Sequence, residues 1–333
     1  MKSHAGQFEK ITAVENLRKA MFLAARGKRE RGSVRLFLEN ADTELAGLQA
    51  ELADGSWRPG VGIQFRIMDP KPRNIYCAPF RDRVVHHAVC DVLEPIWEAR
   101  FSEDSYACRK EKGMHLAVRR SRELARRHGW FCKLDIRRYF DSVDHECLLG
   151  LLLPMFREKS LKQLLELLIR QTFPEGTRSG KGLPIGNLTS QWFANLYLDG
   201  LDHWSKEVLK APGYIRYMDD MVLFADSKAE AWQLHDGVEE WVTRMRRLEL
   251  KKERTVVAPV SEGVPFLGLR VFTQTWRLQR GRFLRTRRKF RSREKRYLTG
   301  ETDAVQLHAS AMAADGVGRW FGFKNILKQT VEV

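Results

Sequence analysis

The sequence lacks any apolar run long enough to cross a membrane. A membrane-spanning helix takes about 20 consecutive apolar residues, and no segment of the 333 residues approaches that length. The first residues also lack the apolar core of a signal peptide. We therefore expect a cytoplasmic protein with no membrane partner. Low-complexity linkers are absent as well, so we expect one multi-lobed protein with contiguous subdomains.

Cysteine is scarce, and its spacing indicates no pairing. The five cysteines are odd in number, and none stands at the short spacing of a zinc-binding pair. We predict that they are reduced, mostly buried side chains that fill space. The nine histidines are scattered, and the adjacent pair His86-His87 favours a packing or surface role over metal ligation. The sequence thus indicates no zinc site.

Acidic residues are too few to balance the basic ones. Lysine and arginine number 58 against 42 acids, which gives a net charge of +16 and a pI near 9.8. This balance indicates a polyanionic partner. The charge is densest from 277 to 296, where Glu294 is the only acid. Counterion release rewards such clustering on a phosphate backbone, although the run could also be a merely solvated helix face. The predicted nucleic-acid contacts are Arg285, Arg287, Arg288, Lys289 and Arg291.

Two adjacent carboxylates, Asp219 and Asp220, interrupt an apolar run that extends from Tyr214 to Ala225. β-Forming residues flank them on both sides, which predicts a tight β-hairpin with the acids at its tip. Adjacent acids repel each other, so their placement favours a neutralising cation, and a divalent metal is the first candidate. The alternative is that the two aspartates simply mark a turn, where aspartate is common.

A third acid, Asp135, is the last residue but one of a short apolar strand that begins at Trp130. Magnesium prefers a few carboxylates together with phosphate oxygens of the substrate. Two-metal phosphoryl transfer needs acids that converge from separate strands and hold the ions about 3.5–4 Å apart. Asp135 facing Asp219 and Asp220 would supply that arrangement.

Five blocks, in order along the chain, make the sequence similar to the reverse transcriptases. Each block alone is weak, whereas their joint order and spacing over roughly residues 60 to 275 are specific. The resemblance implies an RNA-directed DNA polymerase, a nucleotidyltransferase that acts on template RNA, primer, cDNA and dNTPs. The blocks are Lys71-Pro-Arg73, Leu134-Asp135 through Phe140-Asp141, Gly182 to Gln191, Tyr217-Met-Asp-Asp220 and Phe266-Leu-Gly-Leu269.

The resemblance also assigns roles to the acids. Asp135 matches the first metal-binding acid of the family, and Asp219 and Asp220 match its catalytic pair. The implied metal ligands are these three carboxylates and the backbone carbonyl of Ile136. Asp220 is implied to contribute more to the electrostatic field and the hairpin geometry than to direct ligation. The implied cofactor is a pair of Mg²⁺ ions, which Mn²⁺ can replace in vitro.

Three further side chains are implied to contact the dNTP. Lys71 and Arg73, near the turn of a two-stranded hairpin, would neutralise the triphosphate, although such residues are also ordinary turn charges. Phe140 follows Asp135 by five positions, where reverse transcriptases carry a bulky aromatic that leaves no space for a 2′-hydroxyl. The resemblance favours this role for Phe140 over simple core packing.

The block that contains Ile185 and Gly186 indicates which group of reverse transcriptases the sequence resembles most. Both residues are also implied to contact the dNTP. Retroviral and group II intron enzymes place a glutamine where Ile185 stands, and an aliphatic side chain cannot donate the same hydrogen bonds. The pattern from Ile185 to Gln191 looks like that of reverse transcriptases from diversity-generating retroelements. Those enzymes copy a template RNA with errors concentrated at adenines, deliver the cDNA to a variable gene by mutagenic retrohoming, and work with a small, basic, oligomeric accessory protein. We expect the same here.

Other functions stay open at this stage. A defence-associated bacterial reverse transcriptase would share the motifs and make cDNA in an antiviral response. An intron maturase fits less well, because the Pro-Gln-Gly pattern is absent and we expect no maturase extension, and retron enzymes differ around Gly182 to Gln191. A catalytically idle RNA-binding protein is disfavoured, because it would tolerate loss of the acids, all of which are present.

The predicted fold class is α+β, a right-hand polymerase with fingers, a palm of antiparallel sheet plus helices, and a helical thumb. The predicted parts are an N-terminal helical segment (1–60), fingers (61–130), a palm (131–275) with finger elements interleaved around 147–190, and a basic thumb (276–333). Apolar spacing predicts helices over 11–25, 34–52, 82–99, 116–127, 147–172, 188–201 and 229–248, and strands over 61–69 and 73–77.

Overall fold

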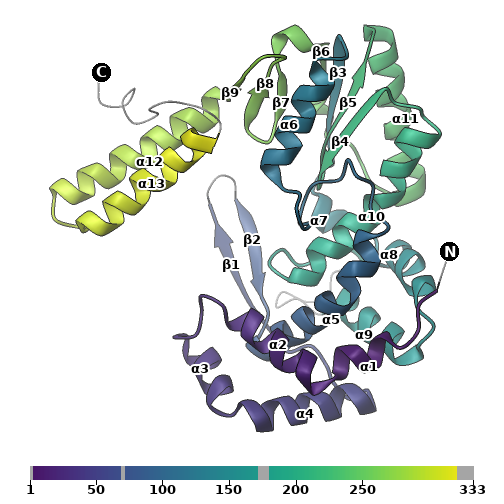
Figure 1. The fold of residues 1–333 in the computed structure, drawn as a ribbon, viewed down its shortest axis with the longest axis vertical. Helices are drawn as coiled ribbons and strands as arrows, with labels where there is room; N and C mark the ends of the chain where they lie inside the picture. The colour runs from purple at the N-terminus through teal and green to yellow at the C-terminus, as the bar shows by residue number, and fades with distance from the viewer. Residues whose placement is uncertain (1–2, 69–71, 172–179, 321–333) are drawn as a thin grey trace.

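The sheet that carries the predicted acids is built from four segments far apart in the sequence. In the computed structural model, which describes residues 3–68, 72–171 and 180–320, its antiparallel strands pair in the order β4-β5-β3-β6 (Figure 1). Asp135 lies opposite Asp220 in the register of β3 and β5. The strands are β3 (Trp130–Asp135), β4 (Gly213–Tyr217), β5 (Asp220–Ala225) and β6 (Val256–Pro259).

Both faces of this central sheet are buried. Successive residues of β3 enter two different apolar clusters, with Cys132 and Leu134 in one and Phe131 in the other. The helix α11 (Lys228–Arg246) packs against β3, β5 and β6, and α6 (Met114–Ala125) packs against β4 and β5 (Figure 1). Burial on both faces explains why these strands read as nearly continuous apolar runs.

Two smaller antiparallel sheets flank the central one. The first is a hairpin of β1 (Ile63–Ile67) and β2 (Arg73–Cys77), whose connecting residues 69–71 lie outside the described part of the chain. The β2 strand has its predicted bounds, and β1 is shorter than the predicted 61–69. The second sheet has the order β7-β8-β9 and consists of β7 (Val264–Phe266), β8 (Leu269–Val271) and β9 (Trp276–Leu278).

The N-terminal helices are shorter than their apolar spacing predicts. The prediction of single helices over 11–25 and 34–52 is wrong, because the chain leaves the helical conformation at Ala13 (ψ 134°) and Asn40 (φ −111°, ψ 25°). Packing around α5 (Phe80–Glu98) overrides the continuous period. The observed helices are α1 (Gln7–Thr12), α2 (Val14–Ala25), α3 (Gly32–Glu39) and α4 (Ala41–Asp54).

The predicted helix over 147–172 is also wrong as a single element, as far as its described residues show. Pro154 lies in a 3-10 turn, η1 (Leu153–Met155), because proline has no N–H to donate and its ring crowds the preceding helical turn. The next helix begins at Leu188 as predicted but continues beyond 201 to Glu207. The helices of this region are α7 (Tyr139–Ser142), α8 (His145–Leu152), α9 (Lys159–Arg170) and α10 (Leu188–Glu207).

The basic run near the end of the described chain is helical, as predicted. A helical pair, α12 (Arg280–Leu298) and α13 (Ala304–Trp320), projects from the β7–β9 sheet (Figure 1). No residue of α12 is buried, so its whole length is available to solvent or to a partner. Short 3-10 turns, η2 (Lys252–Arg254) and η3 (Val260–Glu262), flank β6.

The mixture of helices and antiparallel sheets confirms the predicted α+β class. All five cysteines are free; Cys90 and Cys132 are buried as predicted, whereas Cys108 is exposed. Within the described ranges, no helix combines the length and the apolar character that crossing a membrane requires.

One buried ion pair ties the acid-bearing hairpin to α10. Arg216 of β4 and Asp202 of α10 are fully buried and joined by two hydrogen bonds, of 2.6 Å from Nε and 2.5 Å from Nη2. The Nη1 of Arg216 also donates to the backbone carbonyl of Met218 at 3.1 Å. Because Met218 opens the turn before Asp219, the ion pair fixes the position of that turn.

We predict that Arg216→Met lowers the free energy of unfolding by about 3–5 kcal/mol, because it leaves the Asp202 carboxylate buried without a partner. Arg244→Met is the matched control. It breaks an exposed arginine pair, with Glu240 at 2.7 Å, and should change stability by less than about 0.5 kcal/mol. Urea denaturation of both variants measures the difference, and equal destabilisation would contradict the role given to Arg216.

Candidate active site

The acidic hairpin closes with a two-residue turn. Tyr217 pairs with Asp220, so the turn residues are Met218 and Asp219, and Asp220 is already the first residue of β5. The prediction of both acids at the tip therefore holds for Asp219 alone. Met218 has φ 60°, a backbone angle that is unfavourable for residues other than glycine. The hydrogen bond from Arg216 to the Met218 carbonyl stabilises this conformation.

The acids from the two strands meet at one end of the central sheet. Burial, together with the negative charges of Asp135 and Asp220, raises the pKa of Asp219 to about 6, while the positive charge of Arg73 opposes the shift. Asp135 likewise contributes to a raised pKa of Asp220, for which burial is again the main cause. The three carboxylates are thus close enough to influence one another's protonation.

A lysine on the neighbouring strand neutralises one of these acids. Lys133 Nζ lies 2.7 Å from Asp220 Oδ1, and the two side chains are only 13% and 26% exposed. Lys133 is not among the site residues that the sequence predicts, although it lies on the predicted strand of Asp135. The signal is local: Lys133 precedes Asp135 by two positions, so the alternation of β3 places both on the same face.

The remaining oxygen ligands fit a hard divalent cation. The backbone amide of Arg137 and the backbone carbonyl of Asp135 bond to Glu249 and Lys251 on one side of the chain. The carbonyl of Ile136 between them consequently faces the opposite side, toward the β4–β5 hairpin. Carboxylates together with a carbonyl are the ligands that Mg²⁺ or Mn²⁺ prefers.

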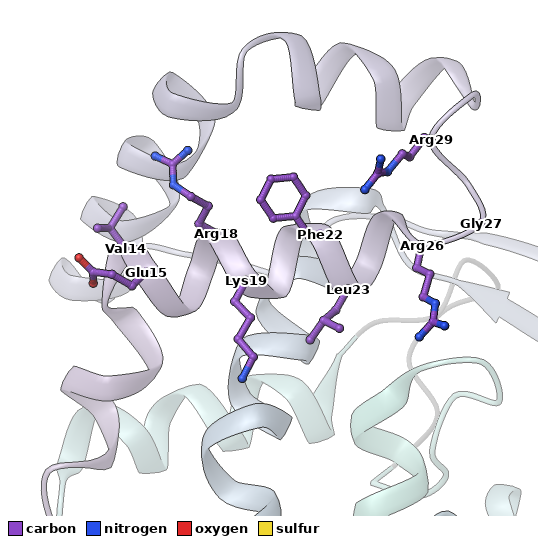
Figure 2. Close-up of a pocket in the computed structure, with 9 residues that line it drawn as sticks. All are labelled: Val14, Glu15, Arg18, Lys19, Phe22, Leu23, Arg26, Gly27 and Arg29. Carbon is purple, nitrogen blue, oxygen red and sulfur yellow. The ribbon is translucent and has the colours of Figure 1, made fainter.

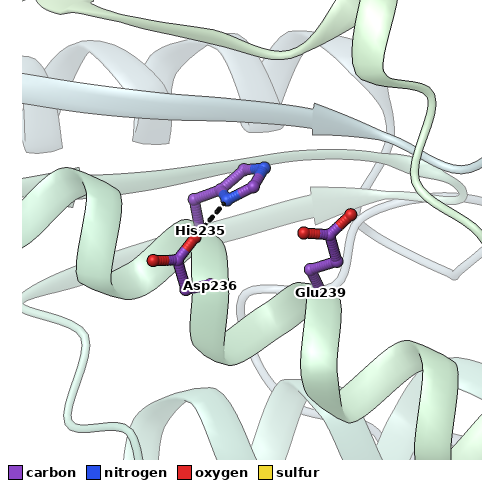
Figure 3. Close-up of side chains that lie close together, drawn as sticks. All are labelled: His235, Asp236 and Glu239. Carbon is purple, nitrogen blue, oxygen red and sulfur yellow. Dashed lines mark hydrogen bonds and ion pairs between the residues drawn. The ribbon is translucent and has the colours of Figure 1, made fainter.

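The carboxylate oxygens of the three aspartates do not all lie within 4.8 Å of one another. Within the described residues, the group that meets this distance is His235, Asp236 and Glu239 on α11 (Figure 3). There Asp236 bonds to His235 Nδ1 at 2.8 Å, and Glu239 faces Lys252 at 3.9 Å. These contacts engage the side chains of the cluster with one another and with Lys252.

Two of the residues predicted to contact the dNTP, Arg73 and Phe140, lie within the described part of the chain. Arg73 begins β2 and is close enough for its charge to lower the pKa of Asp219. Phe140 is half-buried against Tyr139, with ring centroids 5.8 Å apart, and its backbone carbonyl accepts from the Leu183 amide at 2.7 Å. Lys71 lies outside the described residues.

The segment around Ile185 docks against β2. The Ile185 carbonyl accepts from the Tyr76 amide at 2.8 Å. Gly186 has φ 128°, and a Cβ there would stand 2.3 Å from the Tyr76 carbonyl, so this close approach requires glycine. Gln64 and Asn74 of the hairpin line a small hollow together with Ile185. Gln64 and Asn74 are not predicted site residues, since only the folded chain places them beside Ile185.

The predicted nucleic-acid contacts stand away from the acids. Arg285, Arg288, Lys289 and Arg291 are exposed on α12, and Arg287 is half-buried there. They belong to the projecting helical pair and not to the central sheet (Figure 1). The carboxylate site and the long basic surface are therefore separate parts of the structure. Such a separation is expected for chemistry on a polyanion, which needs one site for the reaction and another surface to bind phosphates.

Paired carboxylates at the end of a buried antiparallel sheet, with cations close by, define a site suited to metal-dependent phosphoryl transfer. Residues 68–271 match the family model for reverse transcriptase (RNA-dependent DNA polymerase), which is more than half of the chain. The chain therefore belongs to the reverse transcriptase family. Membership implies dependence on a divalent metal in general.

Individual relatives are distant and often longer. Protein YkfC of Escherichia coli is 25% identical over 68% of this chain and 71% of its own length. The group II intron-encoded protein LtrA of Lactococcus lactis is 27% identical over 63% of this chain, which spans only 35% of LtrA. The apo telomerase of Candida tropicalis has a TM-score of 0.49 at 12% identity, with 74% of this chain and 54% of that one covered.

We predict that Asp219→Asn stabilises the metal-free protein at pH 7.5 by about 1–3 kcal/mol. The pKa of Asp219 is raised from 3.8 to about 6, so the folded state favours the protonated acid. The cost of ionising it is absent below about pH 4 and fully present above about pH 6, and asparagine removes it.

Thermal unfolding in EDTA at pH 4 and pH 7.5 measures this effect. Asp226→Asn, an exposed acid that follows β5 at its other end, is the control and should behave like wild type. Added Mn²⁺ should stabilise wild type more than Asp219→Asn. A difference between the variant and wild type that is the same at both pH values would contradict the assignment.

Proposed function

We propose that this chain is an RNA-directed DNA polymerase whose chemistry takes place at the carboxylate end of the central sheet. The observation that carries the proposal is the pairing of Asp135 with Asp220 beside Asp219, inside the span that matches the family. Asp135, Asp219 and the Ile136 carbonyl would hold two Mg²⁺ ions, with Asp220 beside them. Bound there, the ions would lower the pKa of the primer 3′-hydroxyl and stabilise the charge of the leaving pyrophosphate.

The dNTP would enter between the β1–β2 hairpin and the central sheet. Arg73, together with Lys71, would neutralise the triphosphate, and the reach of the Arg73 charge to Asp219 supports this position. Phe140 would exclude a 2′-hydroxyl and so favour deoxynucleotides. Ile185 and Gly186 would line the same site, because both lie against Tyr76 of β2.

The lobes would divide the remaining tasks as in a right hand. We assign 1–60 to an N-terminal helical segment, 61–130 to fingers, 131–275 to a palm, and 276–333 to a thumb. The thumb carries the basic surface of α12, where Arg285, Arg288 and their neighbours would follow the phosphates of the template RNA, primer and cDNA. The exposure of α12 along its whole length supports this role.

More specifically, we propose that the enzyme belongs to a diversity-generating retroelement and makes cDNA with errors at adenines. The support is the pattern from Ile185 to Gln191, in which an aliphatic residue replaces a hydrogen-bonding glutamine. Without that polar contact, selection of the nucleotide would depend more on shape than on hydrogen bonding.

Such an enzyme would work with a small, basic, oligomeric accessory protein, for which the exposed helices of the N-terminal segment and of the thumb are the two surfaces to compare. On α2, Phe22 is 50% exposed and stands between Arg18 and Arg29 (Figure 2). The arginines that surround Phe22 would repel a basic partner, so this face favours an anionic one such as RNA. The accessory protein would then use a less cationic face, for which α13 is the candidate, since Ala304–Ala311 contains neither lysine nor arginine.

We predict that wild type extends a DNA primer on an RNA template with Mg²⁺ and that Asp219→Ala does not. Loss of about 4 kcal/mol of transition-state stabilisation would slow incorporation about a thousandfold. Asp226→Ala, at the far end of β5, is the matched control and should retain activity. Equal incorporation by wild type and Asp219→Ala would remove the enzyme proposal.

We predict that cDNA made by wild type from a mixed template carries substitutions concentrated opposite adenines, and that Ile185→Gln reduces them by restoring a hydrogen-bonding side chain. Ile185→Leu keeps the aliphatic character and should keep the error pattern. Sequencing the cDNA from all three proteins decides the matter. Ordinary accuracy at adenine in wild type, unchanged in Ile185→Gln, would contradict the retroelement assignment.

A further inference from the structure

One face of α5 carries two buried polar side chains that take no part in the proposed chemistry. Asp82 and His86 stand four residues apart, which places them on the same side of the helix. Their exposed fractions are 4% and 2%. A carboxylate and an imidazole are costly to bury unless each has a hydrogen-bond partner. Both have one, and the two partners lead to opposite ends of the segment from Ile185 to Thr189.

Asp82 is connected to Ile185 through the β1–β2 hairpin. Its Oδ2 accepts a hydrogen bond from the Gly60 amide at 2.8 Å. The Gly60 carbonyl accepts from the Tyr76 hydroxyl at 3.3 Å, and that hydroxyl accepts from the Gly62 amide at 3.0 Å. The Tyr76 amide then donates to the Ile185 carbonyl at 2.8 Å. Each link between two residues in this series is a hydrogen bond, so the carboxylate on α5 fixes the strand that holds Ile185.

His86 holds the other end of the segment directly. Its Nδ1 lies 2.7 Å from the hydroxyl of Thr189, which is fully buried in the first turn of α10. Burial, together with the charge of His87, lowers the pKa of His86 to about 3, so the ring is neutral near pH 7. Between the two ends, the Asn187 side chain donates to Gln171 Oε1 at 3.1 Å. The segment is therefore attached at both ends and in the middle.

The segment also lies directly against β2. A Cβ on Gly186 would stand 2.3 Å from the Tyr76 carbonyl and 3.3 Å from Ile75 Cγ2, so the segment cannot move closer to the hairpin. The Ile185 side chain is half-buried, which leaves part of it available to a substrate while its backbone is held. Selection by shape requires such a fixed surface, because a displacement of about 1 Å can change a rate about a hundredfold.

We propose that Asp82 and His86 are positioning residues that hold the Ile185–Thr189 segment at its two ends and so set the precision with which Ile185 selects the incoming nucleotide. The first part is a statement about the fold, and the second part rests on the proposed polymerase function. Both side chains act through the segment and not on the substrate. The competing account is that they only stabilise the core around α5.

The attachment of Ile185 is tested by hydrogen exchange of the backbone amide at position 76 in metal-free protein. Tyr76→Phe removes only the hydroxyl that bonds to Gly60 and Gly62. It should speed exchange of that amide about three- to tenfold, the effect of weakening one hydrogen bond. Asp82→Ala should do the same, whereas Asp82→Asn keeps an acceptor oxygen and should restore protection. Wild-type exchange in both Tyr76→Phe and Asp82→Ala would overturn the proposal.

Tyr197→Phe is the matched control for the loss of a hydroxyl. It removes a buried tyrosine hydroxyl that also donates to a backbone carbonyl, that of Arg246 at 2.6 Å, away from the segment. Exchange at position 76 should stay as in wild type. The attachment at the other end has its own pair of variants: Thr189→Val removes the partner of His86 at nearly constant volume, and Thr189→Ser keeps the hydroxyl.

Nucleotide selection is tested by single-nucleotide insertion opposite a template guanine, with kcat/KM measured for dCTP and for dTTP. Tyr76→Phe and Thr189→Val should each lower the ratio of the two values about three- to tenfold, because Ile185 is held less firmly. Asp82→Asn, Thr189→Ser and Tyr197→Phe should keep the wild-type ratio. A purely structural role would lower the Tm of Tyr76→Phe and Thr189→Val and leave the ratio unchanged, which would overturn the assignment to nucleotide selection.

The two measurements distinguish a failure of this proposal from a failure of the polymerase function. If wild type does not extend a primer, the proposed function is refuted and the role in nucleotide selection is refuted with it. Hydrogen exchange needs no DNA synthesis, so exchange at position 76 still decides whether Asp82 holds the segment.

Discussion

The buried ion pair between Arg216 and Asp202 is the constraint on which the geometry of the site depends. An arginine in the core is tolerable only if every donor finds a partner, and here the guanidinium reaches Asp202, Asn195, the Ser105 hydroxyl and the Met218 carbonyl. These contacts come from three parts of the chain, since Asp202 and Asn195 both lie on α10. The result is that α10, the segment before α6 and the hairpin turn are held in one arrangement, with Asp219 at a fixed point.

Around that point the fold has to gather like charges. Three carboxylates at one end of a sheet repel each other, and burial strengthens the repulsion because less water screens it. The chain offsets this locally with two cations from different elements, Lys133 on β3 and Arg73 on β2. The net charge around Asp135 and Asp219 therefore stays negative. A hard divalent metal is the cation that fits carboxylate and carbonyl oxygens.

The β7–β8 turn belongs to a sheet that shares an apolar cluster with the central sheet. That turn joins the central sheet to the start of α12 through Arg282 and Gln279. An enzyme of the reverse transcriptase family has to hold a long polyanion while it joins single nucleotides. Packing from the central sheet through the β7–β9 sheet to the basic helix would keep the helix at a fixed position relative to the acids.

The sequence by itself determined the acids, their order, the hairpin around Asp219 and the basic run from 277 to 296. These are local features: period-two alternation, turn preference and charge density depend on neighbours along the chain. It also predicted β2 and the start of α10. The helix predictions were wrong where packing opposed local preference, at Ala13 and Asn40, which interrupt the predicted N-terminal helices.

Tertiary structure alone decided which side chains meet the acids. The pairing of Lys133 with Asp220, the reach of Arg73 toward Asp219 and the docking of Gly186 on Tyr76 join residues from separate strands and loops. Strand order and register set these contacts, and no window of sequence contains both partners. The type of chemistry could therefore be predicted from individual residues in the sequence. The charge balance of the site could not, since it depends on how the strands pair. Electrostatic interactions depend on distance in space and not on separation along the chain.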